Sequence, residues 1–449
     1  MKKYENLSEF SRIYFIGIGG ISLSALSIIM KNHDYIVAGS DLVKSDLTEK
    51  LEREGIFVNY FQIEKNIKDF VPDLVVFSGA IKDDNLELVQ ARKDNIRCLE
   101  RADFLGLLTE NYQNVISISG AHGKTTVTSM LSEVFINAGL NPTVHIGGES
   151  VNLGGNVYCG ENKFFITEAC EYRRSFLKFK TDVAVVLNVE EDHPDCYKNY
   201  EEIFSAFNTF VNNAKKSAII FKELNFTTNT KTITFNFKNA NFTVKKIRRL
   251  NLGYSFSIYK NGNFIKQFRL QIFGKHNIIN ALCVIAICDL YNIDINIIYN
   301  TLYNFKGIKR RFERIESNKI LGEIYADYAH HPTEIKKLIE ETRELDKPII
   351  CIFQPHTYSR TKKYFNDFLK CFDGCYQVLI YKTYSAREKY DRQGSAKNLF
   401  NHLKNDASKN VFYFSSLKKI IAHLKKFSKS NCLVLIVGAG DIYEIKNMM

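Results

Sequence analysis

The chain has 449 residues, of which 45% are hydrophobic and 24% are charged. These values are typical of a folded protein and exclude a largely disordered chain, and the length predicts two to four domains. No stretch reaches the roughly 18 apolar residues of a membrane span, and residues 1–10 lack an apolar signal segment. We therefore expect a cytoplasmic protein without a membrane span.

The net charge of +12 raises the question of a nucleic-acid partner. The lysines are spread over the whole length and form no basic block interleaved with aromatic residues, so nucleic acid is not favoured. Anionic small substrates or a lysine-rich background composition explain the charge equally well. The ten cysteines are scattered without a Cys-x-x-Cys pair, which predicts reduced thiols rather than disulfides or a zinc site.

The first region resembles the start of a dinucleotide-binding fold. A short apolar strand enters Gly17-Ile-Gly-Gly20, a helical pattern follows over 21–30, and a second strand ends at Asp41. The third glycine of the usual motif is missing, so a nucleotide with a diphosphate is favoured over NAD. Further strands near 73–81 and 96–99 place Ser78 and Arg101 at the same sheet edge, where Arg101 is either a phosphate contact or a solvated arginine.

A phosphate-binding loop marks the start of the second region. The apolar run 115–119 predicts a strand, and the next seven residues precede a helical pattern: Gly120, Ala121, His122, Gly123, Lys124, Thr125 and Thr126. Backbone N–H groups of such a loop bind phosphate oxygens, Lys124 reaches the β and γ phosphates, and the Thr125 hydroxyl is a Mg²⁺ ligand. The loop is shorter than the common form, but its strand and helix context predicts an ATP site.

Two residues downstream are candidate metal ligands. Glu168 ends an apolar strand over 163–168 and is either a second Mg²⁺ carboxylate or a surface acid. His193 follows a strand over 182–188 and is either a metal ligand or a structural turn histidine. From about 221 to 274, alternating residues with Asn-Gly turns predict added β-hairpins, and a helix follows Asn277.

The third region begins after a basic hinge candidate over 305–312. Strands are predicted to end near residues 327, 353, 381 and 437, each followed by a polar loop, with Pro332 at a helix start. This pattern predicts a second parallel sheet of nucleotide-binding type. Its loops carry His330, His356, Arg360 and Arg387, which we expect to share one site.

Taken together, these motifs resemble those of the Mur ligase family over essentially the whole chain. The matching segments are Gly17 to Gly20, Gly120 to Thr126, Glu168 to Glu171 with Ser175 to Leu177, Asn188 to His193, Gly274 to Asn277, Lys309 to Phe312, Asp327 to Pro332, Phe353 to His356 with Arg360 and Thr361, and Ala386 to Glu388.

The resemblance implies three α/β domains. These are an N-terminal Rossmann-like domain for a UDP-sugar over 1–107, a central P-loop ATPase-type domain with added β-hairpins over 108–305, and a C-terminal Rossmann-like domain for an amino acid over 306–449. The implied reaction joins L-alanine to the lactyl carboxylate of UDP-N-acetylmuramate through an acyl phosphate, with ATP and Mg²⁺, in peptidoglycan precursor synthesis. We expect a monomer or weak homodimer.

The resemblance also assigns roles to residues. Lys124, Glu168 and His193 are the expected catalytic residues, and Thr125, Glu168 and His193 the expected Mg²⁺ ligands. Outside the phosphate loop, the expected ATP contacts are Asn277, Arg310 and Asp327. The expected UDP-sugar contacts are Gly19, Gly20, Ser22, Asp41, Ser78 and Arg101. The expected L-alanine contacts are Tyr328, His330, His356 and Arg360.

The chain departs from the family pattern in three places. Thr357 stands where many members carry arginine, and Cys170 replaces a common acid. Arg173 and Arg174 are either contacts to the substrate diphosphate or a solvated basic turn.

Three other functions are alternatives to this reaction. A ligase that recycles cell-wall peptides onto the same sugar nucleotide differs only in the amino-acid pocket. A nicotinamide-dependent oxidoreductase leaves the phosphate loop and Glu168 unexplained. A nucleic-acid-stimulated ATPase rests on net charge alone.

Overall fold

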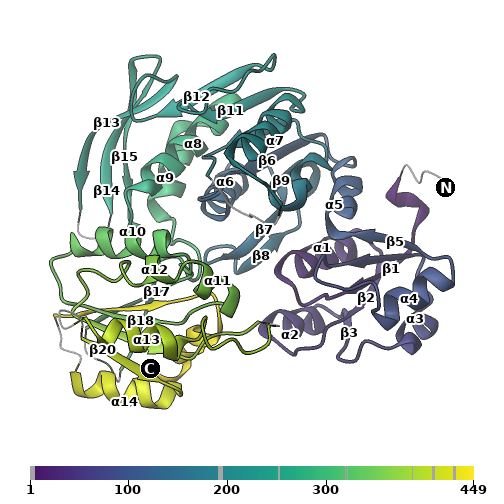
Figure 1. Cartoon of the computed structure of the whole chain (residues 1–449). Helices are drawn as coiled ribbons and strands as arrows, with labels where there is room; N and C mark the ends of the chain where they lie inside the picture. Colours follow the sequence, from purple (N-terminus) through teal and green to yellow (C-terminus); the bar gives the residue numbers. More distant parts are fainter. Residues whose placement is uncertain are drawn as a thin grey trace. The chain divides into compact units, whose positions relative to one another are not determined.

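A computed structural model describes residues 6–190, 196–250, 253–318, 320, 322–386, 388–406, 410–427 and 431–449. The chain divides into two compact units, Met1–Gly307 and Ile308–Met449, close to the predicted boundary after residue 305. The first unit holds two sheets and the second holds one, so the described residues form three α/β domains (Figure 1). The predicted fold class is confirmed.

The N-terminal sheet is parallel, in the order β3-β2-β1-β4-β5. Its strands are β1 (Arg12–Ile16), β2 (Ile36–Ser40), β3 (Phe57–Asn59), β4 (Leu74–Phe77) and β5 (Arg97–Glu100). Its helices are η1 (Leu7–Glu9), α1 (Ile21–Asn32), α2 (Asp46–Arg53), α3 (Glu64–Phe70), α4 (Leu86–Lys93) and α5 (Arg101–Thr109). After Arg12, the strand β1 has no charged residue because both faces are covered: Phe15 packs in the core with α1 and α5, and Tyr14 in the core with α3 and α4.

The central sheet has the order β15-β14-β13-β12-β11-β10-β6-β9-β7-β8 among the described residues. Its strands are β6 (Asn114–Ser119), β7 (Pro142–Ser150), β8 (Gly155–Tyr158), β9 (Glu161–Glu168), β10 (Val183–Val186), β11 (Ser217–Phe221), β12 (Thr232–Asn236), β13 (Phe242–Arg249), β14 (Tyr254–Lys260) and β15 (Asn263–Leu270). Its helices are α6 (Lys124–Asn137), η2 (Tyr172–Leu177), α7 (Tyr200–Asn212), α8 (His276–Leu290) and α9 (Ile295–Asn304).

The predicted hairpins are present at one end of this sheet. Strands β13, β14 and β15 pair antiparallel, and β14 and β15 are joined by Asn261 and Gly262 alone. Both residues have positive φ, +50° and +85°, which a tight two-residue hairpin turn requires. Strands β7 and β8 were not predicted, since Gly147 and Gly148 interrupt the apolar pattern of β7.

The first two sheets share one hydrophobic core. Phe15 and Phe104 of the N-terminal sheet layer belong to the same buried cluster as Phe165 and Phe207 of the central domain. Helix α5 runs through the predicted boundary between residues 107 and 108, because Leu105 and Leu108 are both buried in this cluster.

The second unit has a six-stranded sheet in the order β16-β17-β21-β18-β19-β20, with β17 to β20 and β21 parallel and β16 antiparallel. Its strands are β16 (Glu313–Ile315), β17 (Glu323–Asp327), β18 (Ile349–Phe353), β19 (Gln377–Tyr381), β20 (Val411–Phe414) and β21 (Leu433–Val437). Its helices are α10 (Pro332–Arg343), α11 (Tyr358–Lys363), α12 (Phe365–Phe368), α13 (Ala396–Lys404), α14 (Leu417–Phe427) and η3 (Asp441–Met448). The predicted parallel sheet and the helix start at Pro332 are confirmed.

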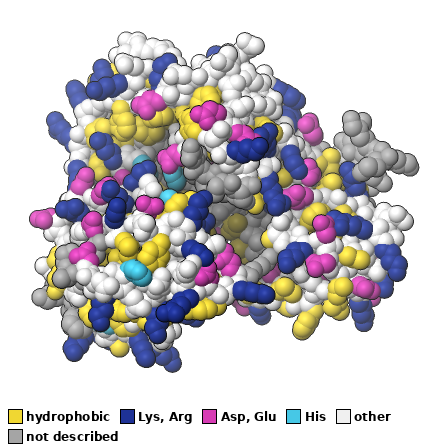
Figure 2. Space-filling model, in the orientation of Figure 1, with side chains coloured by type: hydrophobic (Ala, Val, Ile, Leu, Met, Phe, Trp, Pro, Cys, Tyr) yellow, Lys and Arg dark blue, Asp and Glu magenta, His cyan; other side chains and the backbone are white. Residues whose placement is uncertain are grey.

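The charged side chains and the cysteines are distributed as the sequence predicts. Lysine and arginine side chains are dispersed over the visible face, with acidic side chains between them (Figure 2). The ten cysteines all lie in the described part of the chain and are free thiols. In that same part, no helix combines the length and the apolar character needed to cross a bilayer.

A buried carboxyl group lies on helix α6. Glu133 is 5% exposed and accepts hydrogen bonds from Asn152 Nδ2 (2.7 Å) and Ser150 Oγ (3.3 Å). Burial raises the pKa of Glu133 from its ordinary 4.5 to about 7, and these hydrogen bonds only partly oppose the shift. The folded protein therefore keeps a proton at pH values where the unfolded chain has lost it.

We predict that Glu133 makes the free energy of unfolding fall as pH rises from about 4.5 to about 7, by about 3 kcal/mol once complete. Glu133→Gln removes the ionisation, so the variant should lose this pH dependence and be more stable than the wild type above pH 7. Urea unfolding at pH 5, 6, 7 and 8 measures the effect. The exposed Glu161→Gln is the control, and an equal pH slope in wild type and Glu133→Gln would contradict the prediction.

Candidate active site

The phosphate loop lies between β6 and α6, as predicted. Gly123 takes φ +87° at the N-cap of α6, and no side chain caps the first turn among the described residues. Asn188 fixes the loop through two hydrogen bonds: its Oδ1 accepts from His122 N (2.8 Å), and its Nδ2 donates to the His122 carbonyl (3.0 Å). The backbone N–H groups of the α6 N-terminus are thus oriented for an anion.

Lys124 opens α6 with its ammonium in an ion pair. Its Nζ lies 2.9 and 3.0 Å from the Glu171 carboxylate oxygens and also donates to the Gly120 carbonyl. The side chains of Lys124 and Glu171 are 16% and 2% exposed. Burial lowers the pKa of Lys124, but the charge and hydrogen bond of Glu171 together with the charges of Cys170 and Glu168 outweigh burial, so the pKa is raised overall. The ammonium is therefore charged at neutral pH.

Glu171 is a residue whose role the sequence analysis missed. It belongs to the motif that begins at Glu168, but the sequence pattern assigns a role to Glu168 alone. The signal available was a second acid three residues after the first, directly before the turn η2. Within that turn, Arg173 and Arg174 have φ of +49° and +54°, and Arg174 forms an exposed ion pair with Glu202 (2.8 Å). That pairing favours the solvated basic turn for Arg174.

Glu168 ends β9 beside the phosphate loop. Its Oε1 accepts from Gly147 N (2.6 Å), and its charge adds to that of Glu171 in raising the pKa of Lys124. The Thr125 hydroxyl on the first turn of α6 is the other described oxygen of the expected Mg²⁺ set. His193 lies outside the described residues.

The described residues contain no group of three or more His, Cys, Asp and Glu side chains placed to hold a metal. Mg²⁺ in nucleotide sites uses one or two protein oxygens and completes its shell with water and phosphate. Glu168 and Thr125 are oxygen donors of that kind, so this donor set fits Mg²⁺.

The start of α8 packs against the phosphate loop. Asn277 is buried, with its Nδ2 donating to the Phe273 carbonyl (2.7 Å) and its Oδ1 accepting from Asn280 Nδ2 (3.0 Å). A Cβ atom at Gly123 would lie 2.8 Å from Asn280 Oδ1. The structure thus brings Asn277 near the loop through Asn280, a residue that sequence reasoning did not single out.

A second glycine loop lies between β1 and α1. Asp41 organises it: Oδ2 accepts from Gly19 N (3.0 Å) and Oδ1 from Val43 N (3.1 Å). Helix α1 begins after Gly20 without a side-chain cap in the described chain, so the backbone N–H groups of its first turn are oriented for an anion, as at α6. Ser78 lies across the loop, since a Cβ on Gly17 would be 3.4 Å from its Cβ.

Ser22 and Arg101 meet beside this loop. Arg101 Nη1 lies 3.5 Å from Ser22 Oγ, and Ser22 Oγ lies 2.8 Å from His145 Nε2. His145 belongs to β7 of the central domain and is 3% exposed. Burial, with the nearby charge of Arg101, lowers the pKa of His145 to about 3, so the ring is neutral. The sequence analysis did not identify His145.

In the second unit, Arg310 and Asp327 lie at the carboxyl edge of the sheet. The Arg310 guanidinium lies between the rings of Tyr328 (4.7 Å) and Tyr443 (4.9 Å) and donates to the carbonyls of Gly438 (2.7 Å) and Gly440 (3.0 Å). The half-buried Asp327 carboxylate accepts from the backbone N–H groups of Ala329 (2.8 Å) and Phe312 (2.9 Å), and desolvation raises its pKa.

The predicted loops of this sheet do converge. Arg360 Nη1 lies 3.0 Å from His356 Nδ1, the rings of His330 and His356 are 5.8 Å apart, and His330 Nδ1 lies 3.0 Å from the Tyr328 carbonyl. Burial, with the charges of His330 and Arg360, lowers the pKa of His356 to about 4, so the ring is neutral at pH 7. Arg387 lies outside the described residues.

Thr357 caps the N-terminus of helix α11. It takes φ +65° as the N-cap of α11, and its hydroxyl accepts from Arg360 N (3.4 Å). Glu388, noted only within a motif, accepts from Ser359 N (2.9 Å) and Ser359 Oγ (2.5 Å) at the start of the same helix. These contacts fix the helix that carries Arg360.

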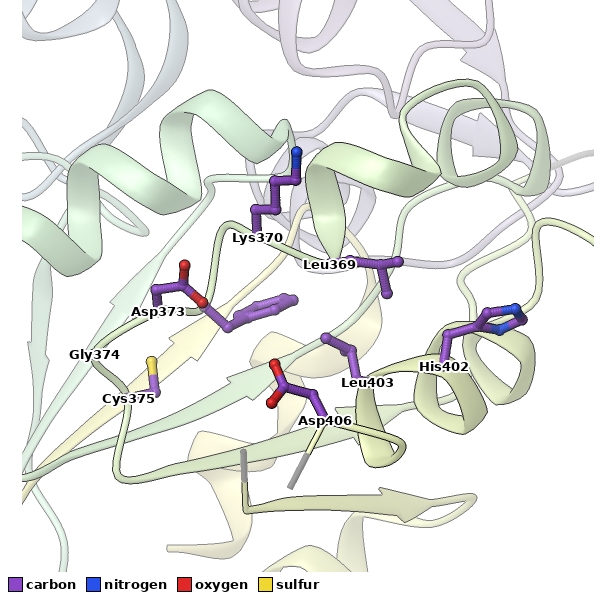
Figure 3. A pocket seen from close by; sticks show the side chains of 9 residues that line it. Leu369, Lys370, Asp373, Gly374, Cys375, His402, Leu403 and Asp406 are labelled. Carbon is purple, nitrogen blue, oxygen red and sulfur yellow. The ribbon is translucent and has the colours of Figure 1, made fainter. Parts of the chain in front are cut away.

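A cavity of about 600 Å³ lies elsewhere in this unit, before the amino end of β19 (Figure 3). Its lining is Leu369, Lys370, Phe372, Asp373, Gly374, Cys375, His402, Leu403 and Asp406. It contains none of the predicted site residues, which follow the carboxyl ends of the strands.

A phosphate loop at a helix start, within parallel α/β domains, defines a nucleotide-dependent enzyme. Three family models match the chain: "Mur ligase family, catalytic domain" over 12–113, "Mur ligase middle domain" over 118–288 and "Mur ligase, glutamate ligase domain" over 310–440. The chain belongs to the Mur ligase family.

Its relatives make the comparison more specific. It is 39% identical to the UDP-N-acetylmuramate--L-alanine ligase of Acetivibrio thermocellus, over 98% of this chain and 96% of that one. It is 39% identical to the protein of the same name from Clostridium beijerinckii, over 96% and 95%. The solved UDP-N-acetylmuramate-alanine ligase MurC of Thermotoga maritima matches with a TM-score of 0.84 and 28% identity, over 97% of both chains. A murein peptide ligase of Psychrobacter arcticus shares the fold, with a TM-score of 0.70 and 21% identity over 98% of both chains.

We predict that Gly123→Ala prevents nucleotide binding. A left-handed φ costs alanine about 1–2 kcal/mol, and its Cβ would press on Asn280 Oδ1. The matched control is Gly139→Ala at the other end of α6, where φ is +73° but nothing lies within 4 Å of the added Cβ. Calorimetric titration with ADP and Mg²⁺ should show lost binding for Gly123→Ala and wild-type binding for Gly139→Ala. Wild-type binding by Gly123→Ala would contradict the prediction.

Proposed function

We propose that this Mur ligase joins L-alanine to the lactyl carboxylate of UDP-N-acetylmuramate, converting ATP to ADP and phosphate, as a step in building peptidoglycan precursors. The observation that carries the proposal is 39% identity, over nearly the whole length of both chains, to ligases named for that reaction. The free thiols suit a cytosolic enzyme. We expect a monomer or weak homodimer.

The first half of the proposed reaction is phosphoryl transfer. The sugar's carboxylate attacks the γ phosphate in line, giving an acyl phosphate and ADP, and such catalysis is mostly positioning and charge stabilisation. The N-terminus of α6 and the Lys124 ammonium are the groups of this chain that would bind the phosphates. The expected Mg²⁺, held by Glu168 and Thr125 with His193, would neutralise further phosphate charge.

Glu171 is the proposed partner of Lys124 when no nucleotide is bound. The ion pair holds the ammonium charged and in place near the loop before a nucleotide binds. When ATP binds, its phosphate oxygens take the place of the Glu171 carboxylate, so the buried ammonium has an anionic partner at both stages.

The second half is attack of the amino acid's amine on the acyl phosphate, with release of phosphate. Arg360 is the proposed partner of the alanine carboxylate, because a guanidinium can bind a carboxylate through two N–H groups. The contact with neutral His356 fixes one guanidinium nitrogen and leaves others for this ligand. Tyr328 and His330 are the other proposed members of the pocket.

The UDP end of the sugar nucleotide is proposed to bind at the N-terminal sheet. The α1 N-terminus with Gly19 and Gly20 would receive the diphosphate, and Ser22 and Arg101 lie beside it. Asp41 supports the loop through the Gly19 N–H, and Ser78 lines it from the next strand end.

The test is phosphate release from ATP and Mg²⁺ in the presence of UDP-N-acetylmuramate, first with L-alanine and then with a cell-wall tripeptide, with the product mass determined. Turnover that requires alanine and adds one alanine to the sugar nucleotide supports the proposal. Turnover with the tripeptide alone identifies the recycling reaction instead. No turnover with either refutes both.

We predict that Lys124→Ala abolishes phosphate release while UDP-N-acetylmuramate still binds, because the ammonium acts on ATP phosphates and not on the sugar site. Calorimetry of the sugar nucleotide and the phosphate assay measure the two effects. Lys178→Ala is the control, since Lys178 also forms a 2.9 Å ion pair, with Asp103, away from the loop. Loss of sugar binding in Lys124→Ala would mean that the substrate sites are wrongly assigned.

We predict that Arg360→Lys raises the KM for L-alanine about tenfold or more, since a lysine cannot reproduce the two parallel hydrogen bonds. The KM for ATP should stay within about twofold. Lys362→Ala on the same helix is the control, because Lys362 pairs with Asp391 at the surface (3.2 Å). An unchanged alanine KM in Arg360→Lys would remove Arg360 from the pocket.

A further inference from the structure

A line of side chains in the first unit runs from the glycine loop before α1 to the end of β9, beside the phosphate loop. Ser22 Oγ lies 2.8 Å from His145 Nε2, and His145 Nδ1 lies 2.9 Å from Thr167 Oγ1. Ser22 belongs to the first turn of α1, His145 to β7, and Thr167 to β9 directly before Glu168. The line therefore runs from the proposed sugar-nucleotide site to the backbone of Glu168, the proposed metal ligand.

The groups at its ends compete for the hydrogen bonds of the line. An arginine can only donate, so Ser22 Oγ accepts from Arg101 Nη1 (3.5 Å) while it also forms a hydrogen bond with His145 Nε2. The neutral ring carries a single hydrogen, and its Nδ1 forms a hydrogen bond with Thr167 Oγ1, which donates to the Glu168 carbonyl (3.2 Å). Each hydroxyl has one proton, so a change of partner at one end is felt along the line.

The strand that carries His145 also holds the Glu168 side chain. Gly147, two residues after His145, donates its N–H to Glu168 Oε1 (2.6 Å). A Cβ atom at Gly147 would lie 2.8 Å from Glu168 Oε2, so only glycine lets the carboxylate approach this closely. One strand, β7, thus contacts the serine of the first loop and the carboxylate beside the second.

We propose that His145 is a positioning residue that couples binding of the sugar nucleotide at Ser22 and Arg101 to binding of nucleotide and Mg²⁺ at Glu168. The inference rests on the proposed function, which assigns ligands to these two loops. An anion that draws Arg101 away from Ser22 alters the first hydrogen bond of the line, and the ring passes the change to the residue next to Glu168. Such coupling is reciprocal, so each ligand tightens the other by the same factor.

The experiment is calorimetric titration of UDP-N-acetylmuramate, without and with Mg²⁺ and a non-hydrolysable ATP analogue. The ratio of the two Kd values is the coupling factor, expected to be about fivefold or more in the wild type. His145→Phe should weaken the sugar nucleotide Kd and bring the ratio near one.

Two conservative variants separate the two contacts of the ring. His145→Gln places a polar group near the position of Nε2, so it should keep the sugar nucleotide Kd but lose the coupling. His145→Asn places one near Nδ1, so it should weaken that Kd and also lose the coupling. Ser22→Ala removes the first hydrogen bond without altering the core and should abolish the coupling. This variant therefore tests the inference even if the substitutions at His145 prevent folding.

The control is His33→Phe at the other end of α1, where His33 Nε2 lies 3.3 Å from Tyr112 OH. His33→Phe should keep the coupling, because it perturbs the packing of α1 without altering the hydrogen bonds of Ser22, His145 and Thr167. If His145→Phe and Ser22→Ala retain the coupling, or if His33→Phe loses it equally, the inference is overturned while the proposed function stands. A wild type that does not bind UDP-N-acetylmuramate overturns the proposed function, and the inference with it.

Discussion

The need to keep a buried cation partnered governs the centre of this protein. Lys124 opens α6 in a site where its side chain is mostly out of water, and Glu171 supplies the compensating charge. The backbone of Glu171 is itself held in place, since the Tyr197 hydroxyl donates to the Glu171 carbonyl (2.6 Å). The turn that follows has two non-glycine residues with positive φ, Arg173 and Arg174, an arrangement that costs about 1–3 kcal/mol at each residue.

Much of this arrangement could be predicted from the sequence, and the reason is local. Alternating strands and helices with polar residues at strand ends fix a parallel sheet and its ligand edge, so the convergence of His330, His356 and Arg360 followed from the strand pattern alone. The phosphate loop was recognisable because glycine, lysine and threonine act through backbone geometry that neighbouring residues determine. The hairpin at Asn261 and Gly262 is another local signal.

The features that were missed depend on contacts between distant segments. His145 lies in a strand, and its proposed role depends on its contact with Ser22, which is 123 residues away in sequence. Asn280 is one of several polar residues of α8, and only the packing of this helix against the loop distinguishes it. Glu171 was visible as an acid, but its partner could not be read from spacing. Helix α5 crosses the predicted domain boundary because its leucines belong to a core built from two sheets, which no local pattern reveals.

The hairpin extension of the central sheet also affects behaviour in concentrated solution. Strand β15 ends the sheet, and a free strand edge is a template for pairing with another chain. Here the edge carries Lys266 and Arg269, and Lys266 is anchored beside the Tyr299 ring of α9 (5.2 Å). Two positive charges on one strand repel the same strand of a second molecule. The edge that enlarges the sheet is therefore protected against strand-to-strand association, and the protein can extend its sheet without becoming prone to aggregate there.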